Sequence, residues 1–387
     1  MSTEPGFIVQ KSRDAIHVSA GKRSDQEQAF GVSRNKGDLE VNVFESFDGF
    51  TVHIFTESGV LEAAQRFSAR TLLVGGGGRG GGGARSGAGG GGGGQVIEGD
   101  ALLYGEMVVG IGKGGLGGQN SEMNNGEASV FLGRVALGGG AGGWGLSEEE
   151  WLTGQPPGIP WGSAGASGGG HAGTYPYVYD VDHHYVGMSS EHGKGGIGIA
   201  GHKGGSGFWG YESYGAPQPG GGGGGGAGDP GFDCYQEAIN GTVIAGDGGP
   251  GVESDIVPLV TRPCPFYGAG GGGCWGVTTY SGGGGAGGSP WLPRPGGGFY
   301  YNTGGNLKPN TGGGWDGTDA AAWPHGGYQN SGSGGGGGTQ AAYDGPNIGN
   351  GGSGADGILV VRYDGLPRAT GGTIYLYDSE GNPVTYA

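Results

Sequence analysis

The chain contains few of the residues that stabilise or localise most proteins. It has three cysteines in 387 residues, an odd number with no CxxC pair, so neither a disulfide framework nor a zinc site is indicated. A Cys264–Cys274 bridge stays open, although we expect buried reduced thiols. No segment approaches the ~20 apolar residues of a membrane span, and the first residues do not resemble a signal peptide. We therefore expect a protein made in a cytoplasm, with no membrane insertion.

Basic side chains are scarce as well. There are 19 lysines and arginines against 35 acidic residues, a formal net charge of −16. Residues 1–74 carry 8 basic and 10 acidic side chains, which leaves 11 and 25, a net −14, for residues 75–387. Such a surface repels phosphate groups, so nucleic acid is not an expected partner, despite Arg79 and Arg85 in an RGG-like stretch. Neutral glycans remain compatible with this charge.

Glycine is the residue present in excess. Residues 75–387 hold 103 of the 109 glycines, in blocks that break the strict three-residue repeat of collagen, and only 20 prolines accompany them. The 38 aromatic residues argue against a disordered linker. We expect polyglycine II helices, three residues per turn, which hydrogen-bond to their neighbours because no Cβ keeps them apart. On a rise of about 3.1 Å per residue, Gly220–Gly226 would span roughly 22 Å.

Residues 1–66 are predicted to form a small β domain that serves for attachment. Its core would be modest, so it would depend on a partner or on the rest of the chain. The alternation of apolar and polar residues on both sides of Asp48-Gly49 predicts a hairpin there. The expected strands are 7–10, 15–19, 41–47 and 50–56.

The glycine-rich domain, residues 67–364, is predicted to have strands at its edges and long aromatic-rich loops, and residues 365–387 a C-terminal β-hairpin. The predicted fold class is therefore mostly irregular and all-β, with a small N-terminal β domain followed by a polyglycine II helix bundle. The expected strands are 67–74, 104–109, 128–132, 356–363, 373–377 and 383–386.

Three stretches in this order carry a resemblance: "TLLVGGGGRGGGG" from Thr71, "VVGIGKGGLGGQNSEMNNGEASVFLG" from Val108, and "GGSGADGILVVRYDG" from Gly351. They resemble the glycine-rich domain of phage tail fibres and receptor-binding tail adhesins over roughly residues 67–364. The resemblance implies a polyglycine II sandwich that displays variable loops. Residues 1–66 and 365–387 lie outside it, and the loops are longer than a bare repeat requires.

The loops supply the candidate receptor-binding residues. Aromatic rings stack on the apolar faces of sugars, and Trp and Tyr give large contact areas at low entropic cost. The alternative is that these rings cover the edges of the bundle, and we assign about half of them to that role. The candidates are Trp144, Trp151, Trp161, Tyr175, Tyr177, Tyr179, Trp209, Tyr211, Trp291, Tyr300, Tyr301, Trp315 and Trp323.

No catalytic site, cofactor or metal is predicted. The acidic and histidine residues within 180–184 lack a spaced partner set, and clustered polar loop residues are usually solvated. Gly110–Gly115 fits GxGxxG, but no helix pattern follows it to bind a phosphate. Together these features predict a virion protein of the phage tail, assembled in the host cytoplasm. It would bind a surface glycan or outer-membrane protein, contact other tail proteins through residues 1–66, and form a homo-oligomer, with a trimer favoured. The alternative is a purely structural connector or decoration protein.

Overall fold

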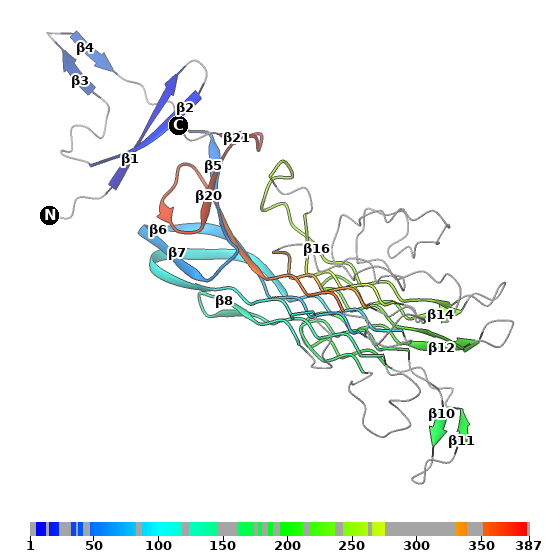
Figure 1. Ribbon diagram of the computed structural model, residues 1–387. Coiled ribbons are helices and arrows are strands. Elements are labelled where there is room, and N and C mark those ends of the chain that lie inside the picture. Colours follow the sequence, from blue (N-terminus) through cyan, green and yellow to red (C-terminus); the bar gives the residue numbers. More distant parts are fainter. Residues whose placement is uncertain are drawn as a thin grey trace.

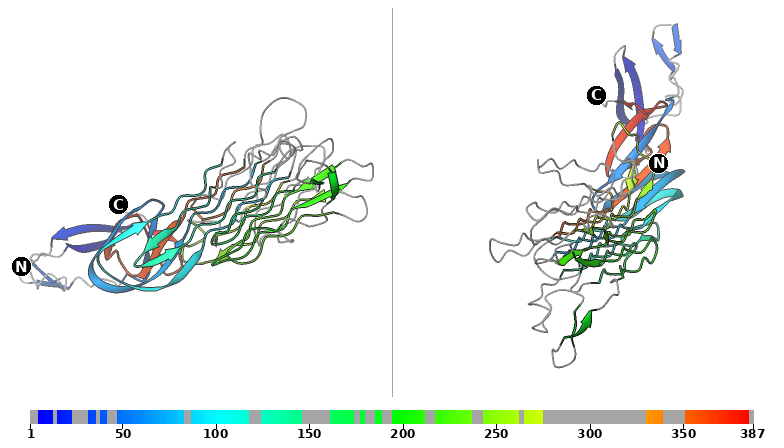
Figure 2. Two further views of the ribbon diagram at one scale, coloured as in Figure 1. Left: turned by 90° about the horizontal axis from the view of Figure 1, so that it is seen from below. Right: turned by 90° about the vertical axis from the view of Figure 1, so that its right-hand side faces the viewer.

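The computed structural model describes residues 5–12, 15–22, 32–35, 38–41, 47–82, 87–117, 124–145, 161–173, 177–179, 185–188, 194–211, 217–236, 243–261, 265–274, 330–338 and 351–384. Over these residues the fold is all-β with a large irregular part and no helix, which confirms the coarse prediction. Nine strands form one antiparallel sheet, and long glycine runs extend from it as nearly parallel tracks (Figure 1, Figure 2).

The sheet follows the order β21-β20-β5-β18-β6-β7-β8-β9, with β19 paired to β6. Its strands are β5 (Gly49–Phe55), β6 (Gly59–Val74), β7 (Val96–Gly110), β8 (Ser129–Phe131), β9 (Arg134–Ala136), β18 (Ile358–Asp364), β19 (Ala369–Thr370), β20 (Thr373–Asp378) and β21 (Pro383–Val384).

The other strands form two-stranded pairs. They are β1 (Pro5–Ser12) with β2 (Ala15–Lys22), β3 (Val32–Asn35) with β4 (Asp38–Val41), β10 (Tyr177–Tyr179) with β11 (Tyr185–Met188), β12 (Phe208–Tyr211) with β13 (Pro217–Gly220), β14 (Tyr235–Gln236) with β15 (Val243–Ile244), and β16 (Val252–Glu253) with β17 (Phe266–Tyr267).

Two elements differ from the sequence prediction. The predicted boundary at residue 66 lies inside β6, and β5 pairs with β18 and β20 rather than with residues 41–47. The physical reason is that β5 is buried along most of its length. A strand in the middle of a sheet is buried in this way because another strand covers each of its edges. Residues 49–136 and residues 358–384, far apart in the sequence, therefore form one sheet.

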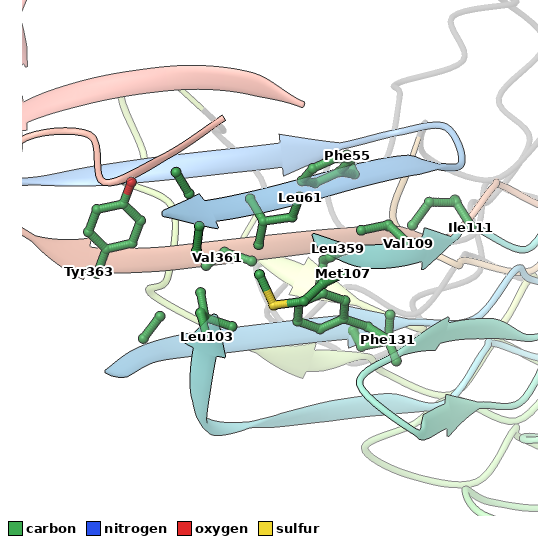
Figure 3. Close-up of a cluster of buried hydrophobic side chains, with 14 of the residues drawn as sticks. Phe55, Leu61, Leu103, Met107, Val109, Ile111, Phe131, Leu359, Val361 and Tyr363 are labelled. Carbon is green, nitrogen blue, oxygen red and sulfur yellow. The ribbon is translucent and has the colours of Figure 1, made fainter. Parts of the chain in front are cut away.

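Strand β18 is the centre of this sheet and supplies its core on both faces. Leu359 and Val361 belong to a cluster that the folded β6–β7 hairpin encloses (Figure 3). The alternate residues, Ile358 and Val360, belong to a second cluster on the other face, where Ile256 covers them. This alternation follows from the two-residue period of a strand and explains why the segment is apolar almost throughout.

The strands continue directly into the glycine runs. β6 leads into residues 75–82, and residues 87–95 return into β7. At the junction, the Ser129 hydroxyl donates to the Val74 carbonyl at 2.7 Å and accepts from the Gly112 amide at 3.0 Å. The described runs are 75–82, 87–95, 111–117, 124–128, 137–145, 161–165, 166–173, 194–200, 201–207, 220–227, 228–234, 245–251, 268–274, 330–338 and 351–357, with bends of the chain at 166–167, 199–201 and 227–229.

Hydrogen bonds between the runs repeat every three residues. In run 75–82 the amides of Gly75, Gly78 and Gly81 all donate to run 87–95, at 2.8–3.0 Å. The two intermediate positions of each turn donate in the same way to two other runs. The amides of such a run therefore point in three directions. A strand in a sheet bonds to two neighbours, whereas a run of this kind can bond to neighbours on every side.

Run 87–95 illustrates the packing, because it bonds to neighbours on all sides. Its amides donate to runs 137–145, 220–227 and 330–338. Its carbonyls accept from three other runs, 75–82, 166–173 and 268–274. A Cβ placed on Gly90 would lie 2.0 Å from the Gly271 carbonyl oxygen, and one on Gly91 2.2 Å from the Gly78 carbonyl oxygen. Glycine is required here because the neighbouring backbone fills the space of a side chain.

Candidate functional site

Three hairpins lie where glycine runs turn back, away from the sheet. β12–β13 connects run 201–207 to run 220–227, and β14–β15 connects run 228–234 to run 245–251. β10–β11 lies between run 166–173 and the run that begins at residue 194. Figure 1 shows all three at the end of the glycine-rich body opposite the sheet.

The structure places four predicted residues in these hairpins. Trp209 and Tyr211 are in β12, where their Cα atoms pair with Pro219 and Pro217 of β13. Proline lacks an amide donor and is confined to edge or irregular strands, so this hairpin is held by a reduced ladder.

Tyr177 and Tyr179 are in β10. Tyr177 pairs with Met188 and Tyr179 with Tyr185, with a change of register between them. A bulge of this kind bends a strand and turns its side chains, and such bulges occur at sheet edges and next to functional sites.

Two predicted tryptophans lie in the glycine-rich body itself. Trp144 is buried, 3% exposed, and the Arg79 guanidinium carbon lies 5.4 Å from the centre of its ring, a cation–π contact. Trp161 is 61% exposed on an outer run. The Trp144 ring is therefore packed in the interior, whereas the Trp161 ring is accessible to a partner.

The remaining predicted candidates lie outside the described residues. They are Trp151, Tyr175, Trp291, Tyr300, Tyr301, Trp315 and Trp323. The acidic and histidine residues within 180–184, and Cys264, are outside them as well. Cys234 and Cys274 are buried thiols, and the Cys274 sulfur accepts a hydrogen bond from the Ala88 amide at 3.1 Å.

Sequence reasoning missed two exposed aromatic residues, one on run 228–234 and one at the start of β14. Phe232 is 45% exposed and Tyr235 54%, and Asp229 precedes them at the same three-residue spacing. The signal was available, because the hydrogen bonds between the runs repeat every three residues and residues 229, 232 and 235 have the same spacing. The segment 229–235 contains one glycine, so the sequence alone did not identify it as part of a glycine run.

The described residues contain no group of three or more His, Cys, Asp or Glu side chains that could hold a metal ion. Gly110 ends β7 and an extended glycine run follows, so over this segment GxGxxG has no helix N-terminus. No described helix is long and apolar enough to cross a membrane.

Two buried histidines have lowered pKa values. Burial lowers the pKa of His171 to about 4, and its Nδ1–H donates to the Ala172 carbonyl. Burial also lowers the pKa of His53, which bonds to the Gly371 carbonyl and to the Tyr363 hydroxyl, each at 2.8 Å. A carbonyl can only accept, so His53 donates through Nδ1 and Nε2 accepts from Tyr363. Both rings have structural partners.

Comparison with known proteins gives no assignment: no protein-family model matches the chain, and no curated protein is significantly similar to it.

Proposed function

We propose that this chain is a tail-fibre or tail-tip protein of a phage virion, assembled in the host cytoplasm, which binds the host cell surface. The observation that carries the proposal is the separation of two ends. The sheet, formed by residues 49–136 and 358–384, lies at one end of the glycine-rich body, and the aromatic-bearing hairpins lie at the other (Figure 1). An attachment end and a display end are what an adhesin requires.

The glycine-rich body would be a bundle of polyglycine II helices. The three-residue repeat of its hydrogen bonds and the bonding of run 87–95 to surrounding runs support this. In runs 75–82, 87–94 and 221–226 no described glycine has a positive φ, as expected for left-handed, polyproline-II-like backbone with φ near −75°. Such a bundle would be stiff, so the hairpins would be held in a fixed arrangement.

The hairpins would bind a glycan or an outer-membrane protein. Their aromatic residues suit the apolar faces of sugars, and the net charge of −16 disfavours nucleic acid and anionic lipid. We propose that residues 1–66 contact other tail proteins and that the chain acts by binding, without catalysis. Several copies on one particle would strengthen weak single sites through avidity.

Binding of the fluorescently labelled full chain to a panel of bacterial strains tests this proposal. The double variant Trp209→Ala/Tyr211→Ala should lose saturable binding to a strain that the wild-type chain binds. Tyr104→Ala is the matched control, because Tyr104 is equally aromatic and 60% exposed but lies on β7 in the sheet. Equal loss in both variants, or no loss in either, would contradict a receptor-contacting role for the hairpin.

A purely structural connector or decoration protein is the second candidate, and the buried Trp144 favours it for part of the aromatic set. Particles that carry the Trp209/Tyr211 variant distinguish the two. Normal assembly with failed adsorption supports the adhesin, whereas failed assembly supports the connector.

A further inference from the structure

The outer side of the sheet carries a group of exposed aliphatic side chains. Val60 and Val108 alternate along β6 and β7 with the buried Leu61 and Met107, so they point away from the cluster that the hairpin encloses (Figure 3). Exposed and buried residues alternate in the same way along β8 and β9. The outer patch, as we call this group, consists of five side chains that are 41–69% exposed: Val60, Val108, Val130, Leu132 and Val135.

The outer patch is continuous across four strands. Val60 pairs with Val108 between β6 and β7, and Val130 pairs with Val135 between β8 and β9. Strand β8 also pairs with the end of β7. There a Cβ on Gly110 would lie 2.5 Å from a methyl carbon of Val130, so Val130 covers this glycine and reaches toward β7. Paired side chains have their Cβ atoms about 4.5–5.5 Å apart, so the two pairs form one surface.

Two glutamates border the outer patch. Glu62 and Glu106 pair directly across β6 and β7, next to the Val60–Val108 pair on the same side of the sheet, and both are exposed. Like charges directly opposite each other destabilise a sheet. Neither carboxylate pairs with a basic side chain within the described part of the chain. A cation between the two carboxylates would bond to both and remove the repulsion.

Farther along β6, the chain itself covers the outer side of the sheet and shows how a segment binds there. Ile256 and Val257, which follow β16, belong to one buried cluster with Leu72. Beside them, the Asp255 carboxylate pairs with the Arg70 guanidinium at 2.6 Å. This segment places two aliphatic residues on the sheet and pairs the adjacent charge with an opposite charge of β6. The outer patch and its two glutamates offer the same combination with the charge reversed.

We propose that the outer patch is a docking surface for a different protein, one that presents aliphatic residues next to a lysine or an arginine. The aliphatic residues of the partner cover the outer patch, and its cation lies between Glu62 and Glu106. A symmetric contact between two copies of this chain would instead bring four carboxylates together, so the charge selects a different partner.

Two synthetic peptides test the charge preference on the full chain. One has the sequence of residues 254–259, Ser-Asp-Ile-Val-Pro-Leu, and the other has arginine in place of the aspartate. Titration of the isotope-labelled chain, followed through amide chemical shifts in NMR spectra, detects weak binding. The arginine peptide should shift the signals of residues 60–62, 106–108 and 130–135, and should bind at least about tenfold more tightly than the aspartate peptide.

Charge variants separate docking from folding. Glu62→Lys replaces a like-charge pair by an opposite-charge pair, so the unfolding midpoint in urea should rise while the arginine peptide no longer binds. Glu62→Lys combined with Glu106→Lys should reverse the preference, so that the aspartate peptide binds more tightly. The matched control, Asp229→Asn combined with Glu253→Gln, removes two exposed carboxylates elsewhere and should leave binding of the arginine peptide unchanged.

Equal binding of both peptides, or no binding at millimolar peptide, would overturn the proposed docking, as would an equal loss in the control variant. Self-association of the wild-type chain that Glu62→Lys abolishes, measured by light scattering, would make a second copy the occupant and would overturn it as well. Docking is separate from receptor binding, because the outer patch lies on the sheet and the aromatic hairpins lie at the other end of the body (Figure 1). Loss of host binding therefore leaves these results unchanged.

Discussion

Replacement of Gly223 by valine should destabilise the protein far more than an ordinary surface substitution. Gly223 lies in the interior run 220–227, and a Cβ on it would sit 1.8 Å from the carbonyl oxygen of Asp247 and 2.2 Å from its carbonyl carbon. Both atoms are backbone, so no side chain can rotate away. The whole run 245–251 must move by more than an ångström to restore ordinary contact distances.

The cost can be worked out from the hydrogen bonds that such a shift breaks. The amides of Gly246 and Gly249 donate to the carbonyls of residues 221 and 224 at 2.9 and 2.8 Å, and both bonds cross the gap that must open. A buried backbone group left without its partner costs about 1–3 kcal/mol, so two broken bonds, counted at one group each, give about 2–6 kcal/mol. Gly223→Ala should already show most of this loss, because the clash begins at Cβ.

Equilibrium unfolding in urea measures the effect, with Ala164→Val as the matched control. Ala164 is an exposed residue on an outer run of the same body, where extra methyl groups meet solvent. A second control is Gly59→Ala in β6, whose Cβ would lie at an ordinary 3.7 Å from the Phe55 ring. If Gly223→Val unfolds at the same urea concentration as these controls, the packed arrangement of the runs is wrong.

Three further predictions concern the core and the buried histidines. Ile256→Ala should cost about 2–5 kcal/mol, measured by urea unfolding, because the side chain is fully buried against the sheet; a loss below about 1 kcal/mol would contradict that packing. Ser129→Ala should cost about 2–6 kcal/mol, since it removes the partner of two buried backbone groups, and Ser129→Thr, which keeps the hydroxyl, should cost less. Burial lowers the folded-state pKa of His171 from 6.5 to about 4, so the unfolded chain binds its proton first as the pH falls. Stability should be level above about pH 6.5 and decrease by up to about 3 kcal/mol toward pH 4, with the lowered pKa of His53 acting in the same direction. An unfolding midpoint that does not fall over this pH range would refute the buried, neutral state of these rings.

The sequence predicts the strands of the sheet well where the apolar period is clear. The apolar segment that became β18 was predicted from its own residues, as was the strand that leads into Gly75. The pairing of strands that lie far apart in the sequence could not be predicted in this way. β5 was expected to form a local hairpin about Asp48-Gly49, but the residues that bury its two edges come from the far end of the chain.

The candidate site was predicted less completely, for a physical reason. A tryptophan in a glycine-rich stretch can serve either as an exposed contact or as the filler of a gap, and composition does not distinguish the two. Trp144 lies buried beside Arg79, whereas Trp161 is exposed, although both have similar sequence surroundings. The exposed Phe232 and Tyr235 become visible only when the three-residue period is applied to the outer runs.

Binding of the labelled chain to a permissive host strain, before and after periodate oxidation of the surface polysaccharide, tests the proposed function most directly. We predict saturable binding of the wild-type chain that the Trp209→Ala/Tyr211→Ala variant loses. Loss after oxidation would identify a glycan receptor, and persistence would identify a protein receptor. A wild-type chain that shows no saturable binding to any strain of a broad bacterial panel would contradict the proposed adhesin.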